Sequence, residues 1–131
     1  MKELFKLNLS NEELKDILEI NPEIKEMENE EIKELINLLK NVGCEERHIT
    51  NIIYANPFYF SRSYEDIKAL ILKLYQLGLT HIYTIFDSNP FLLNKDSDEI
   101  DKFIEIKQKE GLSLEEIIDI IDSDSYQIDE I

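Results

Sequence analysis

The dipeptide Asn-Pro recurs along this chain at an almost constant interval, and it constrains the fold more than any other feature. It occupies residues 21–22, 56–57 and 89–90, which gives spacings of 35 and 33 residues. A further 35 residues along the chain, the same place holds Asp124-Ser125. A repeat of this length is one supersecondary unit, and such a unit buries its apolar face only by stacking on its neighbours.

Apolar residues keep the same positions within each copy. Ahead of each dipeptide they follow the i, i+3, i+4 pattern of one face of a short helix. The matching sets are Leu14, Ile17 and Leu18; Ile49, Ile52 and Ile53; Ile82, Ile85 and Phe86; and Ile117, Ile120 and Ile121. A longer apolar pattern follows each dipeptide, from Ile32, Ile67 or Ile100 to a glycine eleven residues later. Each copy therefore predicts two helices.

Residues suited to helix ends stand at the boundaries of these patterns. Proline cannot continue a helix and disfavours the α conformation in the residue before it, so the first helix should end at Asn-Pro. Gly43, Gly78 and Gly111 stand where the longer helix needs a left-handed residue. Capping-box spacing is found for Ser10 with Glu13 and for Ser113 with Glu116, and Ser63 is expected to cap a longer helix.

The chain is therefore predicted to be a single all-α domain over residues 1–131. We expect an α-solenoid of about 3.5 helical repeats of 33–35 residues, at approximately 9–43, 44–78, 79–111 and a partial 112–131. The third longer helix has Lys107 and Glu110 at otherwise apolar positions, so one end of it should face water.

Two further expectations concern the ends and joints of the stack. The isoleucine-rich helix of the partial copy should fold over the open end as a cap, although docking on a partner or on a second copy is the alternative. The aromatic residues directly after the repeat dipeptide, Phe58, Phe91 and Tyr126, are expected to fill the space between repeats rather than to contact a ligand.

The relative positions of the apolar residues, the Asn-Pro dipeptides and the glycines resemble those in the repeats of the mTERF family, the mitochondrial transcription termination factor-like proteins. The residues that carry the resemblance are Ile49, Ile52, Ile53, Asn56-Pro57, Ile67, Leu70, Leu74 and Leu77-Gly78-Leu79, followed by Ile82, Ile85 and Asn89-Pro90-Phe91-Leu92-Leu93. The resemblance implies a left-handed superhelix of triangular three-helix units, with a short third helix after the proline. It also implies nucleic-acid binding along a concave, basic groove, whereas no basic stripe recurs at one repeat position of this chain.

The charge is strongly acidic and unevenly distributed. The net charge is −15; residues 1–43 carry 6 basic and 11 acidic side chains, residues 44–95 carry 5 of each, and residues 96–131 carry 3 and 13. Such a field disfavours nucleic acid and attracts basic partners, or it serves solubility alone. No apolar run is long enough to span a membrane. The single Cys44 fits a reducing compartment, and a cytoplasmic, bacterial protein is the default expectation.

No residue pattern predicts catalysis, a metal or another cofactor. His48 and His81 share one repeat position, too far apart for one zinc ion, and this position is expected to face solvent. Cys44 stands beside Glu45 and Glu46, which would raise rather than lower the pKa of its thiol.

The neutral central repeats provide the candidate binding surface, because Tyr and Arg are favoured contact residues. The candidate residues are Arg47, Tyr54, Tyr59, Arg62, Tyr64, Lys68, Tyr75, His81 and Tyr83. The favoured function is a protein-binding module for a basic partner, in its sharpest form an acidic inhibitor of a nucleic-acid-binding protein. Alternatives are nucleic-acid binding through the same surface, if Arg47, Arg62, Lys68 and Lys73 converge, and self-assembly through the last helix.

Overall fold

The computed structural model describes residues 2–130, and these residues form helices joined by short turns, without a strand. The α-helices are α1 (Lys2–Phe5), α2 (Asn11–Ile20), α3 (Asn29–Asn41), α4 (Glu46–Ala55), α5 (Tyr64–Gln76), α6 (Ile82–Ser88), α7 (Ser97–Lys109) and α8 (Leu114–Ser123). Within the same residues, four short 3-10 helices begin at the second residue of the repeat dipeptides: η1 (Pro22–Glu26), η2 (Pro57–Ser61), η3 (Pro90–Asn94) and η4 (Ser125–Glu130). The predicted all-α helical repeat is confirmed, with the short third helix that the resemblance implied.

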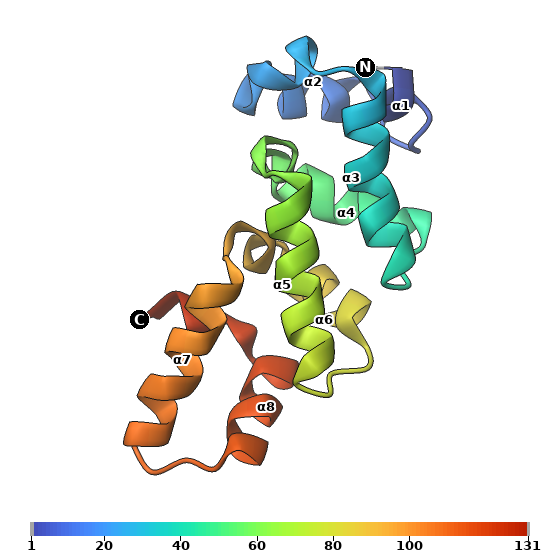
Figure 1. Cartoon of the computed structure of the whole chain (residues 1–131). Coiled ribbons are helices and arrows are strands. Elements are labelled where there is room, and N and C mark those ends of the chain that lie inside the picture. Colours follow the sequence, from blue (N-terminus) through green and yellow to red (C-terminus); the bar gives the residue numbers. More distant parts are fainter. Residues whose placement is uncertain (1, 131) are drawn as a thin grey trace.

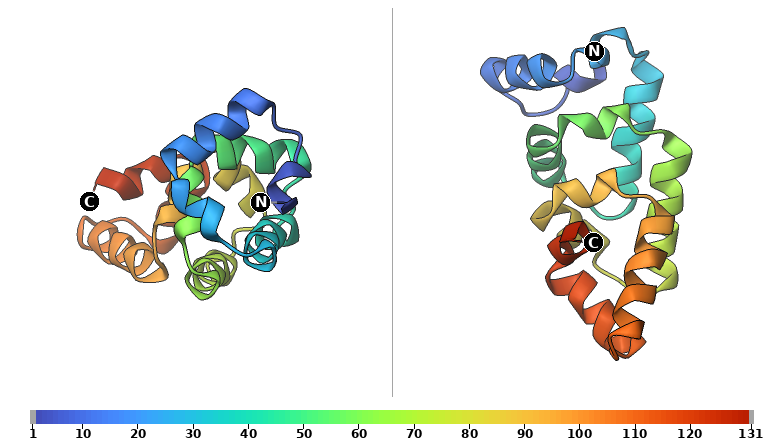
Figure 2. Two further views of the ribbon diagram at one scale, coloured as in Figure 1. Left: turned by 90° about the horizontal axis from the view of Figure 1, so that it is seen from above. Right: turned by 90° about the vertical axis from the view of Figure 1, so that its left-hand side faces the viewer.

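Each complete repeat contributes one helix to each of three columns, while α1 and the partial copy extend these columns at the two ends (Figure 1). The first column is α2, α4, α6 and α8, and the second is α1, α3, α5 and α7; within each, consecutive helices are in contact. In the third column η1 contacts η2 and η2 contacts η3, while η4 packs on α7 and α8. Seen from above, α3, α5 and α7 follow one another along one edge of the molecule (Figure 2). The stack is therefore a solenoid.

Each first-column helix carries a triplet of apolar residues at i, i+3 and i+4, and the second and third of these pack against different neighbouring repeats. Ile52 and Ile85 are buried, whereas their equivalent in the last repeat, Ile120, is only partly buried. Conversely Leu18 in the first repeat is only partly buried, whereas its equivalent in the last repeat, Ile121, is fully buried. The second residue of the triplet thus faces the following repeat and the third faces the preceding one.

The partial copy continues the stack in register. Helix α8 packs against α6 and α7 and buries Ile117 and Ile121, and η4 buries Ile128. It therefore covers the end of the third repeat, as the cap expectation required. As expected, α7 ends in polar residues near water, where Lys107 lies 3.2 Å from the Glu110 carboxylate.

The asparagine of each Asn-Pro dipeptide joins its own repeat to the next one. The buried Asn21 side-chain amide donates to the Pro57 carbonyl and to the Ser61 hydroxyl, both at 3.0 Å. One repeat later, Asn56 donates to the Pro90 carbonyl at 3.1 Å and to Asn94 Oδ1 at 3.0 Å. The series ends where Asn89 donates to the Ser125 hydroxyl at 3.0 Å. These bonds hold successive η helices at a fixed spacing, which explains why asparagine recurs beside proline.

The three glycines end the long helices as predicted. Each has a positive φ, and in each case two backbone bonds close the turn in the Schellman pattern. At Gly43 these bonds run from its own N–H to Lys40 and from the Cys44 N–H to Leu39. The following loop is two residues shorter in the third repeat, where three residues rather than five separate the glycine from the next first-column isoleucine. This deletion produces the 33-residue spacing and the short helix α6.

We expect Gly43→Ala to destabilise the protein more than Gly78→Ala. Both replacements place a side chain at a positive φ, +103° and +93°, which costs on the order of 1–2 kcal/mol. At position 43 the added Cβ would also lie 3.1 Å from Tyr83 Cδ1, whereas at position 78 it meets nothing within 4 Å. The crowding adds about 1 kcal/mol or more. Urea unfolding followed by circular dichroism measures the difference; equal losses would contradict the contact with Tyr83.

Candidate binding surfaces

The nine residues proposed from the sequence do not form one surface. Helix α4 runs from the Gly43 turn to η2, and α5 returns from η2 to the Gly78 turn. Residues at the edge of the glycine turns are Arg47, Tyr75, His81 and Tyr83. Residues at the opposite edge, beside the η helices, are Tyr54, Arg62, Tyr64 and Lys68, and Tyr59 lies in the interior.

Tyr59 is the clearest correction to the sequence analysis, because its side chain is fully buried. Its hydroxyl donates to the Leu35 carbonyl of the preceding repeat, and its ring packs edge-on against Phe60 at 5.7 Å. Burial raises the pKa of this phenol far above its usual value. Tyr59 therefore belongs to the core between repeats one and two rather than to an exposed surface.

Arg62 was also assigned to partner binding, and the structure gives it a different role. Its side chain is only 17% exposed. The guanidinium donates to the Leu93 and Lys95 carbonyls at 3.0 and 2.9 Å and pairs with Asp96 at 2.6 Å. Since these acceptors lie at the end of η3 and in the turn after it, Arg62 connects the second repeat to the third.

The two histidines both lie beside one tyrosine ring. The Tyr83 ring centroid is 5.4 Å from that of His48 and 6.2 Å from that of His81. His48 is buried, so the expectation of a solvent-facing position is wrong for it. Its Nδ1 accepts the backbone N–H of Glu45 at 2.9 Å and completes the cap of α4. Within residues 2–130 no cluster of three or more His, Cys, Asp or Glu side chains could hold a metal ion.

Cys44 is a buried, free thiol. Burial, followed by the charge of nearby Asp87, raises its pKa to about 12. At neutral pH the sulfur is therefore a protonated thiol, which is a poor nucleophile. The direction agrees with the sequence expectation, but the carboxylate involved is Asp87 rather than Glu45 or Glu46.

Most cations of the central repeats lie within ion-pair distance of a carboxylate. Arg47 Nε lies 3.2 Å from Glu45 and Lys73 Nζ lies 2.9 Å from Asp101. Lys68 Nζ lies 5.9 Å from the centre of the Tyr64 ring. Tyr54, at the end of α4, donates its hydroxyl to Asp16 at 3.0 Å. Most of these polar side chains therefore already contact another side chain of the same chain.

A row of exposed aromatic rings follows the third column, and the sequence analysis placed these rings wrongly. Phe58, Phe91 and Tyr126 are 50%, 45% and 46% exposed, so about half of each ring faces solvent instead of filling the space between repeats. The next two positions of η2 and η3 point inward instead, as with the buried Tyr59 and Phe60. We call Phe58, Phe91 and Tyr126 the aromatic row.

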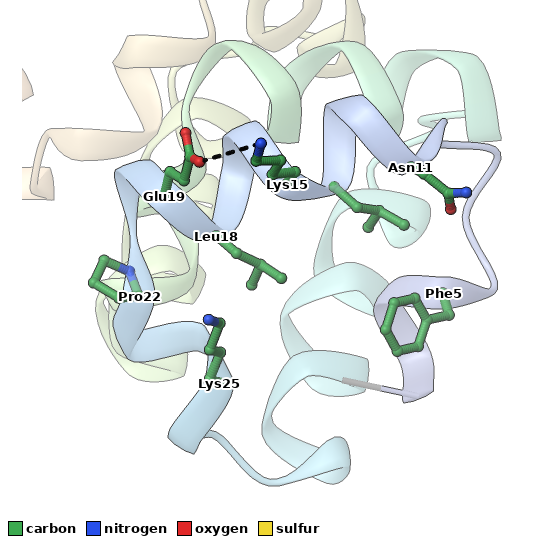
Figure 3. Close-up of a pocket in the computed structure, with 8 residues that line it drawn as sticks. Phe5, Asn11, Lys15, Leu18, Glu19, Pro22 and Lys25 are labelled. Carbon is green, nitrogen blue, oxygen red and sulfur yellow. Dashed lines mark ion pairs between the residues drawn. The ribbon is translucent and has the colours of Figure 1, made fainter.

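A shallow groove lies at the N-terminal end of the stack (Figure 3). Its apolar lining comes from α1, α2 and η1 and includes Phe5, Leu18 and Pro22. Lys15 and Lys25 stand beside these side chains, with Lys15 4.0 Å from Glu19. In later repeats the position of Leu18 is covered by the preceding repeat, which explains why this face is apolar.

These features define a helical-repeat protein of the solenoid class. The sequence model of the mTERF family matches residues 1–127, nearly the whole chain, and the chain therefore belongs to the mTERF family. The resemblance drawn from the Asn-Pro repeat is confirmed. No curated protein and no solved structure matches the chain. Among residues 2–130, none of the helices has the length and apolar character needed to cross a membrane.

Proposed function

We propose that this protein is a non-catalytic binding module of the cytoplasm and that its partner is a basic protein. The observation that carries this proposal is that most of the basic side chains in the central repeats form ion pairs with carboxylates. Of the four cations on which the nucleic-acid alternative depends, Arg47, Arg62 and Lys73 are paired with carboxylates. Phosphate binding depends on free Lys and Arg, so a chain of net charge −15 with these cations occupied favours a basic partner.

Membership of the mTERF family favours a second candidate, nucleic-acid binding. That function requires Arg47, Arg62, Lys68 and Lys73 to converge on one concave face. Instead Arg47 lies at the start of α4, beside the Gly43 turn, and Arg62 is packed against the turn after η3. The arrangement of these cations therefore supports the first candidate over the second.

The sharpest form of the proposal is an acidic inhibitor that occupies the nucleic-acid groove of a basic protein. The charge on α7, α8 and η4 supports it, because residues 96–131 carry 13 acidic and 3 basic side chains. An acidic surface of this kind attracts the same groove that attracts phosphates.

Calorimetric titration with a synthetic arginine-rich peptide tests the proposal. We expect saturable binding of one peptide per chain at about 150 mM salt, weakening steeply as salt rises because screening shortens the range of the charges. A peptide with citrulline in place of arginine is the matched control and should not bind. Absence of binding to the arginine peptide even near 20 mM salt would reject a basic partner.

A further inference from the structure

The aromatic row has a regular geometry. Its members stand at one repeat position, directly after Pro57, Pro90 and the equivalent Ser125. The Tyr126 hydroxyl donates to the Ser88 carbonyl at 3.0 Å, so this ring lies against the end of the preceding first-column helix. Since η2 and η3 are in contact and neighbouring helices pack about 8–10 Å apart, we expect Phe58 and Phe91 to be separated by roughly that distance.

The surroundings of the row are acidic. The exposed Glu23 occupies the same position in the first repeat, so the row ends in a carboxylate. Asp87 and Asp122, near the ends of α6 and α8, precede Phe91 and Tyr126 by four residues and add to the negative charge of this part of the chain. The nearest cation along η3, Lys95, is paired with Glu99 and Asp129 at 3.5 and 3.4 Å. Exposed rings beside carboxylates form a surface complementary to cations with an apolar or planar body.

We infer that the aromatic row binds an extended, basic segment of the partner protein, with an arginine at every third residue. This inference rests on the proposed function and specifies its surface and the shape of its ligand. Each guanidinium would stack on a ring and face a carboxylate. A second copy of this chain is disfavoured as the occupant, because two chains of net charge −15 repel each other.

The spacing of the rings selects the conformation of the bound segment. A polyproline II chain rises about 3.1 Å per residue with three residues per turn, so every third side chain returns to one face after about 9 Å. An extended segment of about seven residues therefore reaches all three rings. An α-helix rises about 1.5 Å per residue and offers a side chain to successive rings only about once every seven residues.

The test uses two labelled peptides of identical composition in a fluorescence anisotropy titration with the whole protein. One carries four Arg-Pro-Pro triplets, and the other carries its four arginines together. We expect the triplet peptide to bind more tightly. Phe91→Ala should weaken its binding about two- to fivefold, the range for one exposed cation–π contact. Phe58→Ala should act likewise, and the double variant should weaken binding by about the product of the two.

Two variants show whether the rings of the row themselves make the contact. Phe5→Ala removes an exposed aromatic ring on α1, outside the row, and should leave binding unchanged. Phe91→Leu keeps an apolar side chain but removes the ring, and should weaken binding nearly as much as Phe91→Ala. Circular dichroism confirms that each variant is folded.

The outcomes separate this inference from the function on which it rests. Equal binding of both peptides, unaffected by Phe58→Ala and Phe91→Ala, would overturn the aromatic row and leave the basic partner in place. Tighter binding of the peptide that carries its four arginines together would overturn the extended conformation. Failure of every arginine peptide to bind would overturn the proposed function as well.

Discussion

Tyr59→Ala should lower the free energy of unfolding by about 4 kcal/mol, a large fraction of the stability of a small domain. The side chain is fully buried, and its removal leaves a cavity between the first two repeats. It also leaves the Leu35 carbonyl without the hydroxyl that bonds to it. Urea unfolding monitored by circular dichroism gives the change, provided that the transition remains two-state.

Two milder substitutions show whether this loss comes from burial. Tyr59→Phe keeps the ring and removes only the hydrogen bond, so about 1 kcal/mol is expected. Tyr64→Ala removes a tyrosine that stands at the surface of α5 and should change stability by less than about 0.5 kcal/mol. If Tyr59→Ala left stability unchanged and abolished peptide binding, Tyr59 would be a contact residue after all.

Asn56→Asp should cost about 3–5 kcal/mol at pH 7, because it breaks the joint between the second and third repeats. The amide of Asn56 donates to the Pro90 carbonyl and to Asn94 Oδ1. A carboxylate there has no proton to donate and is buried against two acceptor oxygens. The cost should fall as pH is lowered. Repulsion and burial raise the folded-state pKa of the new carboxyl above its unfolded value, so the folded state gains stability as it takes up a proton.

Asn94→Asp provides the matched control for this joint. Asn94 acts as an acceptor through Oδ1 at the exposed end of η3, and a carboxylate accepts the Asn56 amide equally well. We expect a change of less than about 0.5 kcal/mol. Equal destabilisation by the two substitutions would show that the bond from Asn56 does not hold the repeats together.

The local elements of the fold could be read from the sequence because they depend on short-range physics. Apolar spacing gave the helices, and proline and glycine gave their ends. The capping boxes at Ser10 and Ser113 have the predicted partners, and Ser63 caps α5 as expected. The role of the Asn side chain was missed, because its acceptors lie 34 to 40 residues away along the chain. The recurrence of asparagine at one position among apolar residues was the sequence signal for these bonds between repeats.

The candidate site was predicted less well, since residue type alone does not tell which face of a 3-10 helix a side chain occupies. Phe58 and Tyr59 are neighbours in the sequence, and their placements were exchanged: the expected packing residue is exposed and the expected contact residue is buried. Arg62 was selected for its charge, but it bonds to carbonyls that follow 31 and 33 residues later. Whether these side chains are exposed or buried depends on how the repeats stack.

The central claim is that this chain keeps the mTERF fold with a surface suited to a basic protein rather than to phosphates. The most direct measurement is a titration of labelled single- and double-stranded DNA and RNA with the purified protein near 20 mM salt, where attraction between charges is screened least. We predict no binding at protein concentrations of tens of micromolar. Micromolar binding that is lost as salt rises would contradict the claim and restore nucleic acid as the ligand.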